Sequence, residues 1–159
     1  MHSISLPPGE FGGDDVLHLF LGTLDCSRHP FYEGLRGLRV SAHFLIRRDG
    51  QPLQFVSCDR RAWHAGASSW RGVPACNDRS IGIEMEGLEG DGFTAPQYRA
   101  AGHLLRVLSS RYPVRDVVGH EHVAPMRKRD PGAGFDWAGL GRAIRSAEPH
   151  VWPLLAIEP

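Results

Sequence analysis

The fold is decided by the stretch LRVSAHFLIR, residues Leu38–Arg47. Its first half alternates, with Leu38, Val40 and Ala42 facing one way and the residues between them facing the other. A period of two is typical of a β-strand. The stretch then runs into the continuous apolar segment Phe44–Ile46, as in the central strand of a sheet. We therefore predict a sheet built around this segment.

The residues that follow predict further strands. Residues 48–51 (Arg-Asp-Gly-Gln) form a hairpin turn signal, and Leu53–Val56 is the expected returning strand. Ser80–Met85 alternates as well, with its isoleucines on one face and Gly82 and Glu84 on the other.

Three segments have the features of helices. Val16–Leu24 is preceded by aspartates that can cap it. Thr94 and Gln97 form a capping box that opens a second helix, which Pro113 ends, and Phe135–Ala147 is the third. Strands and helices in mixed order predict an α/β fold, in which one mixed β-sheet is flanked by α-helices.

Length and composition place the chain among ordinary globular proteins. With 159 residues, 42% hydrophobic and 23% charged, we expect a single domain over residues 1–159, of which the proline-rich residues 149–159 form a tail. The balance of 18 basic and 18 acidic residues gives no reason to expect binding to nucleic acid or to an anionic membrane.

The chain also lacks the signals of export. No apolar run approaches the roughly 18 residues of a membrane span, and residues 1–25 lack a basic start followed by an apolar stretch. The three cysteines are odd in number and lack C-x-x-C spacing, which favours free thiols in a reducing compartment. We therefore expect a cytoplasmic protein.

The most informative stretch for chemistry is Gly119–Gly132. His120 follows an apolar pair at the end of an expected short strand over residues 116–118, and Asp130 comes ten residues later, before Pro-Gly. Neutral imidazole and carboxylate both bind zinc, but a catalytic site needs three protein ligands and an open position for water. The residues alone leave four candidates for the third ligand: His2, His43, His64 and His122.

Two charged residues have spacing that suits catalysis. Glu84 shares a strand face with Gly82, which leaves room for a bound ligand. Glu86 has the same parity, and an ordinary exposed position is the alternative for both. Lys128, two residues before Asp130, could supply positive charge to an oxyanion, although the neighbouring arginines also suit a solvated basic loop.

Residues 57–79 form a long segment without periodicity, which in a compact domain is often functional. Trp63 and His64 there combine an aromatic wall with a polar ring, which suits a sugar or peptide groove. A structural histidine is an equally good interpretation of His64.

These residues together resemble the AmpD-type N-acetylmuramoyl-L-alanine amidases, a zinc family shared with phage lysozyme-amidases and peptidoglycan recognition proteins. The similarity covers nearly all of residues 2–140 in the family's order. Five segments carry it: residues 2–13, 39–50, 61–66, 76–87 and 119–137.

The resemblance implies roles residue by residue. His2, His120 and Asp130 fall on the ligands of one Zn²⁺, and His43 falls on a histidine that is not a ligand. Glu84 falls on the acid that handles the water proton, and Lys128 on the lysine that stabilises the tetrahedral intermediate. We also expect three residues to contact the substrate: Trp63, His64 and Asn77.

The resemblance likewise implies the reaction, which is hydrolysis of the amide between the muramoyl lactyl group and L-alanine in cell-wall recycling. The loop over residues 5–13 is similar to that of enzymes whose substrates are 1,6-anhydromuropeptides. We expect a monomer that takes this small muropeptide as its partner.

Two other functions remain open at this point. The first is a muropeptide-binding module without catalysis, against which the presence of Asp130 argues. The second is an unrelated cytosolic metallopeptidase, but the sequence contains no H-E-x-x-H motif.

One departure from the family concerns the amino terminus. Family members have a strand before the first histidine ligand, whereas here that histidine is residue 2, so we expect the N-terminal strand to be missing. A ligand at a frayed terminus carries a large ordering cost. We expect either a natural start further upstream, which we favour, or weak zinc binding. Ser3 also stands where relatives usually have asparagine.

Overall fold

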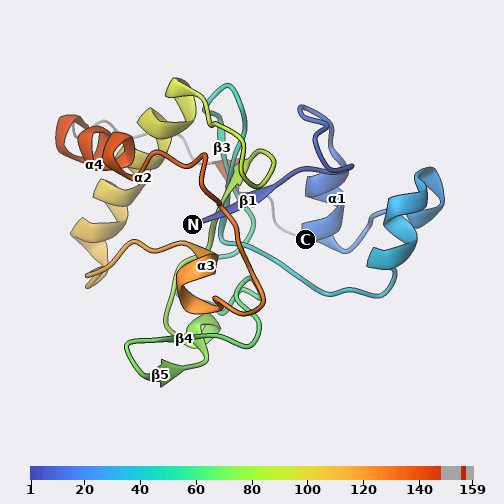
Figure 1. The fold of residues 1–159 in the computed structure, drawn as a ribbon, viewed down its shortest axis with the longest axis horizontal. Helices are drawn as coiled ribbons and strands as arrows, with labels where there is room; N and C mark the ends of the chain where they lie inside the picture. Colours follow the sequence, from blue (N-terminus) through green and yellow to red (C-terminus); the bar gives the residue numbers. More distant parts are fainter. Residues whose placement is uncertain (148–154, 157–159) are drawn as a thin grey trace.

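The computed structural model describes residues 1–147 and the backbone of the two-residue strand β7 (Leu155–Ala156). The main sheet has five strands in the order β1-β6-β2-β3-β7, of which only the β2–β3 pair is antiparallel (Figure 1). The other strands of this sheet are β1 (His2–Ile4), β2 (Phe44–Ile46), β3 (Pro52–Gln54) and β6 (Ile83–Glu86). The rest of the tail predicted over residues 149–159 lies outside the described residues.

Four α-helices and a small hairpin complete the described part of the chain. The hairpin pairs β4 (Ser69–Trp70) with β5 (Val73–Pro74) inside the segment predicted as a loop. The α-helices are α1 (Asp15–Leu21), α2 (Ala95–Arg111), α3 (His120–Val123) and α4 (Trp137–Ser146). Short 3₁₀ turns are η1 (Cys26–Arg28), η2 (Pro30–Leu35) and η3 (Cys76–Asp78).

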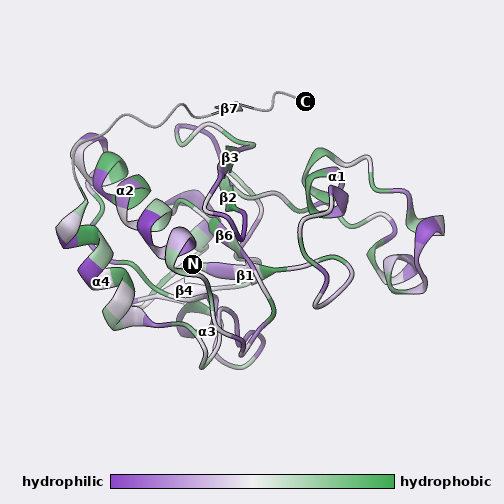
Figure 2. Cartoon of the chain, turned by 90° about the horizontal axis from the view of Figure 1, so that it is seen from above, coloured by the Kyte–Doolittle hydropathy of each residue, from purple (hydrophilic) through white to green (hydrophobic). Residues whose placement is uncertain are grey.

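The mixed sheet flanked by helices confirms the predicted fold class. Helices α2 and α4 lie on one side of the sheet and α1 on the other, and the two views agree (Figures 1 and 2). The side chains of Phe44, Ile46, Ile83 and Met85 pack towards α2. Leu45 points the opposite way, into a second core with residues of α1 and η2. Side chains that alternate along the strands therefore pack into two different hydrophobic cores, one on each side of the sheet.

The capping box that opens α2 is confirmed. The Thr94 hydroxyl accepts a hydrogen bond from the Gln97 amide, and the Gln97 side chain accepts one from the Thr94 amide. Helix α1 differs, because the carboxylate of Asp14 at its N-cap position makes no capping bond and instead pairs with Arg47 at 2.8 Å.

The first strand begins at His2 itself, with no strand before it, and the histidine is nevertheless anchored in the sheet. β1 begins at His2 and pairs in parallel with β6, with His2 opposite Glu84. On its other side, the Met1 nitrogen donates to the Val118 carbonyl at 2.6 Å, and the His120 amide donates to the Met1 carbonyl at 3.1 Å. Because the backbone is paired on both sides, His2 is held in the sheet and is only 5% exposed.

The three predicted strands that form are shorter than expected, and a fourth is absent. Of the stretch over residues 38–47 only Phe44–Ile46 joins the sheet, because the Ser41 amide bonds to the Trp63 carbonyl instead of to a neighbouring strand. Residues 116–118 do not form a strand. Within the described residues, no helix has the length and apolar character needed to cross a membrane.

Candidate metal centre

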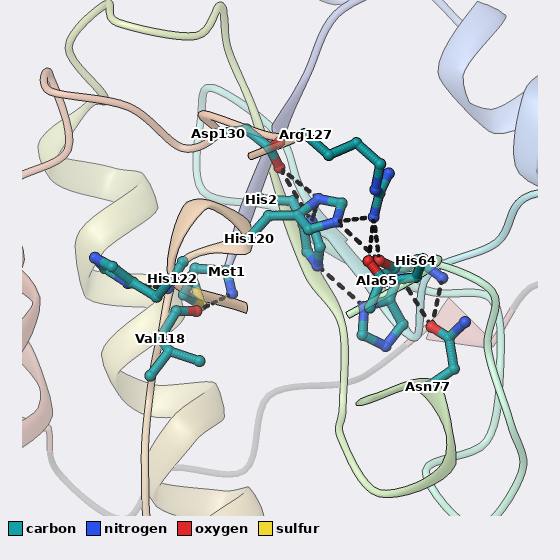
Figure 3. Close-up of polar contacts among 12 residues, drawn as sticks. Met1, His2, His64, Ala65, Asn77, Val118, His120, His122, Arg127 and Asp130 are labelled. Carbon is teal, nitrogen blue, oxygen red and sulfur yellow. Dashed lines mark hydrogen bonds and ion pairs between the residues drawn. The ribbon is translucent and has the colours of Figure 1, made fainter. Parts of the chain in front are cut away.

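Three donor atoms from distant parts of the chain converge at one end of β1. His2 opens β1, His120 opens α3, and Asp130 lies in the loop that follows α3. His2 Nδ1 lies 3.0 Å from His120 Nδ1 and 3.1 Å from Asp130 Oδ2, and His120 Nδ1 lies 3.2 Å from the same oxygen (Figure 3). All three side chains are buried, and they form a group able to hold a metal ion.

The spacing of these atoms fits zinc. Ligands at about 2.0–2.1 Å from a tetrahedral ion lie about 3.3 Å from one another, close to the separations found here. Two imidazoles and one carboxylate also match the donor set of catalytic zinc sites, which keep the fourth position open for water.

The outer nitrogens of both histidines have partners of their own. His120 Nε2 lies 3.1 Å from the Ala65 carbonyl, and His2 Nε2 lies 3.0 Å from His64 Nδ1. Metal-binding histidines usually make such bonds with the nitrogen that does not face the ion.

Among the four histidines that the sequence left open, the structure brings His2 to the cluster. His43 is occupied elsewhere, since its Nδ1 accepts from the Gly82 amide and its Nε2 donates to the Arg60 carbonyl. His122 Nδ1 accepts from the Gly119 amide, and its ring points away from the cluster (Figure 3).

Burial and close contacts keep the donors in the forms that bind metal. Burial lowers the pKa of His2 to about 3, so its imidazole is neutral. Burial acts to raise the pKa of Asp130, but the contacts of its carboxylate with the His120 and His2 rings outweigh it and hold that pKa well below its usual value. Asp130 is therefore ionised.

Glu84 lies beside this cluster with an unused oxygen. Its Oε2 is buried and has no hydrogen-bond partner among the described residues. Burial, and next the nearby negative charge of Asp130, raise the pKa of Glu84 to about 8. A carboxylate of this kind accepts a proton readily at neutral pH.

Lys128 lies in the loop between α3 and Asp130 and is half-buried. The positive charge of Lys128 acts to lower the pKa of Glu84, so Lys128 lies near the site.

The neighbouring Arg127 is not simply a solvated surface residue, because its guanidinium donates to the carbonyls of Ala65 and Ala67 at 2.6 and 3.1 Å.

The three residues expected to contact substrate have different surroundings. Trp63 is 52% exposed, with the Arg61 guanidinium 3.9 Å from its ring centroid. His64 lies behind His2. Asn77 is 6% exposed, and its Oδ1 accepts from the amides of His64 and Ala65 at 3.1 and 2.8 Å. Substrate contact stays a prediction for all three.

Sequence reasoning missed the Ala65 carbonyl and the contacts of Arg127. A backbone carbonyl carries no side-chain signal, and no periodicity relates residue 65 to residues 120 and 127. The only available signal was the position of Ala65 next to His64.

Comparison with known proteins identifies the family of this chain. The family model described as N-acetylmuramoyl-L-alanine amidase matches residues 16–133. The 1,6-anhydro-N-acetylmuramyl-L-alanine amidase AmpD of Citrobacter freundii is 50% identical over 152 residues, which cover 94% of this chain and 81% of that protein. The AmpD of Escherichia coli (strain K12) is 51% identical over 140 residues, covering 87% and 76%.

Solved structures are similar as well. A crystal structure of a selenomethionine AmpD derivative superposes with a TM-score of 0.88 at 50% identity and covers 90% of this chain and 81% of that one. The Escherichia coli amidase AmiD, in complex with anhydro-N-acetylmuramic acid-L-Ala-D-γ-Glu-L-Lys, gives a TM-score of 0.63 at 34% identity, covering 71% and 52%.

Proposed function

Because this chain belongs to the N-acetylmuramoyl-L-alanine amidase family, and is a muropeptide amidase, we propose that it acts with one Zn²⁺ held by His2, His120 and Asp130. The proposed substrate is a 1,6-anhydromuropeptide, and the bond cleaved joins the muramoyl lactyl group to L-alanine. The AmpD relatives carry this activity in their names, and the AmiD structure is a complex with an anhydromuropeptide substrate.

The observation that carries the proposal is the convergence of three donor atoms beside one unpartnered carboxylate oxygen. His2 and Glu84 are opposite each other in the β1–β6 ladder, so the sheet itself sets their separation. A metal ligand and a proton acceptor held on adjacent strands suit the hydrolysis of an amide.

Zinc, when bound, lowers the pKa of a coordinated water and polarises a carbonyl oxygen. Glu84 accepts a proton as the water oxygen bonds to the lactyl carbonyl carbon. The same carboxyl then gives that proton to the alanine nitrogen as the carbon–nitrogen bond breaks. Lys128 directs positive charge at the oxygen on which negative charge develops.

We also propose that residues 1–159 act as one domain, as a monomer, in the cytoplasm. The free thiols of Cys26, Cys58 and Cys76 support a reducing compartment. Trp63, His64 and Asn77 remain the proposed substrate contacts.

The test combines zinc content with product analysis. Purified protein is assayed for bound zinc and incubated with an anhydromuramoyl tripeptide, and the products are identified by mass spectrometry. We expect one zinc per chain, together with free peptide and anhydro-N-acetylmuramic acid. Zinc binding without cleavage would instead support the muropeptide-binding module.

The Glu84→Gln variant tests the proton acceptor separately. Loss of a general acid–base group typically costs about 10²–10⁴-fold in rate, so we expect kcat to fall by about that factor while zinc stays bound. Glu89→Gln, at an exposed position, is the matched control and should keep full activity. A Glu84→Gln enzyme with normal turnover would remove Glu84 from the mechanism.

A further inference from the structure

The outer nitrogen, Nε2, of each proposed histidine ligand contacts the same short segment, His64–Ala65. One contact goes to the Ala65 carbonyl and the other to the His64 ring (Figure 3). A neutral histidine has one N–H and one lone pair, so the group at its outer nitrogen decides which nitrogen is free for a metal.

For His120 the assignment follows at once. A carbonyl oxygen only accepts hydrogen bonds, so the 3.1 Å contact assigns the hydrogen on His120 Nε2 to the Ala65 carbonyl. The Arg127 guanidinium also lies 3.4 Å from this nitrogen, but it donates to the same carbonyl at the shorter distance of 2.6 Å. The lone pair of the neutral ring is then on Nδ1, which faces the cluster.

For His2 the assignment follows through two further side chains. The Ser80 hydroxyl donates to the Cys76 carbonyl at 2.6 Å, so its oxygen is left to accept from His64 Nε2, 3.5 Å away. With the hydrogen of His64 on Nε2, its Nδ1 accepts from His2 Nε2 at 3.0 Å. The lone pair of His2 is therefore on Nδ1, which also faces the cluster.

The segment that receives both contacts is held by one side chain. Asn77 Oδ1 accepts from the backbone amides of His64 and Ala65, and this oxygen is buried. Asn77 itself makes no hydrogen bond to the three proposed ligands within the described residues. The His64 ring packs on Gly82, where a side chain would collide with it.

We propose that Asn77 is a positioning residue for the metal: by fixing His64 and Ala65, it sets the tautomer and the orientation of both histidine ligands. This inference rests on the proposed zinc function. It gives the side-chain oxygen of Asn77 a role in addition to the substrate contact proposed above. Partners of this outer kind typically contribute about 10–100-fold to metal affinity.

The test uses three variants of the full chain. Asn77→Ala removes the shared acceptor, and Asn77→Asp keeps an oxygen able to accept both amides. Ser41→Ala is the matched control, because it removes the neighbouring bond from the Trp63 amide to Ser41 Oγ, at 3.0 Å, without touching His64 or Ala65. Zinc affinity is measured by competition with a chromophoric chelator, and the ligand field by the visible spectrum of the cobalt-substituted protein.

We expect Asn77→Ala to weaken zinc binding by about 10–100-fold and to alter the cobalt spectrum. Asn77→Asp should restore both readouts, and Ser41→Ala should leave both unchanged. An Asn77→Ala protein with wild-type zinc affinity and spectrum overturns the inference. If the wild-type chain itself binds no zinc, the proposed function fails instead, which separates the two outcomes.

A further variant covers the case in which Asn77→Ala does not fold. His64→Ala removes the acceptor of His2 alone, so zinc affinity should fall by a similar factor while the His120 contact to Ala65 remains. Unchanged zinc affinity in folded His64→Ala would contradict the assignment of the His2 tautomer.

Discussion

Glu84 and Glu86 project from the same face of β6, yet their surroundings give them different capacities. Glu86 accepts a hydrogen bond on each oxygen, from the Gly12 amide at 2.6 Å and from the Arg48 amide at 2.9 Å, so it ties two loops to the sheet. Glu84 has a buried oxygen that finds no hydrogen-bond partner among the described residues. Of the two carboxyls, Glu84 is therefore the one whose surroundings suit the proposed proton transfer.

The role of Lys128 can be tested by truncation. Lys128→Ala should lower kcat by about 100-fold or more, because loss of one oxyanion partner typically costs that much. KM should change far less, since the charge acts mainly on the transition state. Steady-state kinetics on an anhydromuropeptide give both values.

Arg129→Ala is the matched control for Lys128, since Arg129 is the exposed residue next to it. It should leave kcat unchanged. Near-normal turnover in Lys128→Ala would show that the oxyanion does not depend on this lysine.

At the scale of elements, the two long helices depend on close contact at Gly102. A Cβ placed at Gly102 of α2 would lie 2.6 Å from the carbonyl carbon of Ala143 in α4 and 2.9 Å from its Cβ. The glycine therefore allows the two helix backbones to approach each other, which offsets its poor helix propensity.

Two glycine-to-alanine changes should consequently have opposite effects. Gly102→Ala should lower the free energy of unfolding by about 1–3 kcal/mol, because the added methyl overpacks the α2–α4 contact. Gly141→Ala in α4, where the nearest neighbour of a Cβ is the flexible Arg145 side chain at 3.4 Å, should raise it by about 0.5–1 kcal/mol through helix propensity. Urea unfolding followed by circular dichroism measures both, and equal effects would contradict the packing argument.

Across the whole molecule, the proposed metal joins parts of the chain that are far apart in sequence. His2 comes from an edge strand, His120 from the segment that pairs with Met1 beside it, and Asp130 from the loop after α3, where its carbonyl accepts from the Glu121 amide. An ion that binds only the folded arrangement stabilises the fold by mass action.

Removal of metal should therefore lower the thermal stability of the whole domain. At free zinc 100-fold above Kd the stabilisation is about 2.7 kcal/mol, which corresponds to a fall in Tm of about 5–10 °C for a chain of this size after chelation. Differential scanning calorimetry with and without a chelator measures the shift. An Asp130→Ala variant is the control, since its Tm should not change when zinc is added. If the Tm of the wild-type protein stayed the same after chelation, zinc binding would not be linked to the stability of the fold.

Much of the secondary structure was accessible from local pattern. The beginning of α2 follows from the side chains of Thr94 and Gln97, which bond to amides three residues away. The two faces of β6 follow from alternation alone. The ends of β2 were not accessible, because the Ser41 amide bonds to Trp63, a partner that alternation does not reveal.

By itself, the sequence determined the kinds of donor available, the alternation of the strands and the signals that begin and end α2, because each depends on residues a few positions apart. Residue pattern left open which histidine joins His120 and Asp130 and which glutamate is the acid, and the family resemblance named His2 and Glu84. The tertiary structure brings His2 to the cluster, leaves one Glu84 oxygen unpaired among the described residues, and alone reveals that Asn77 holds the segment behind both imidazoles. Those outcomes depend on the register of β1 against β6 and on hydrogen bonds that span more than a hundred residues. Local periodicity carries no information about contacts of that range.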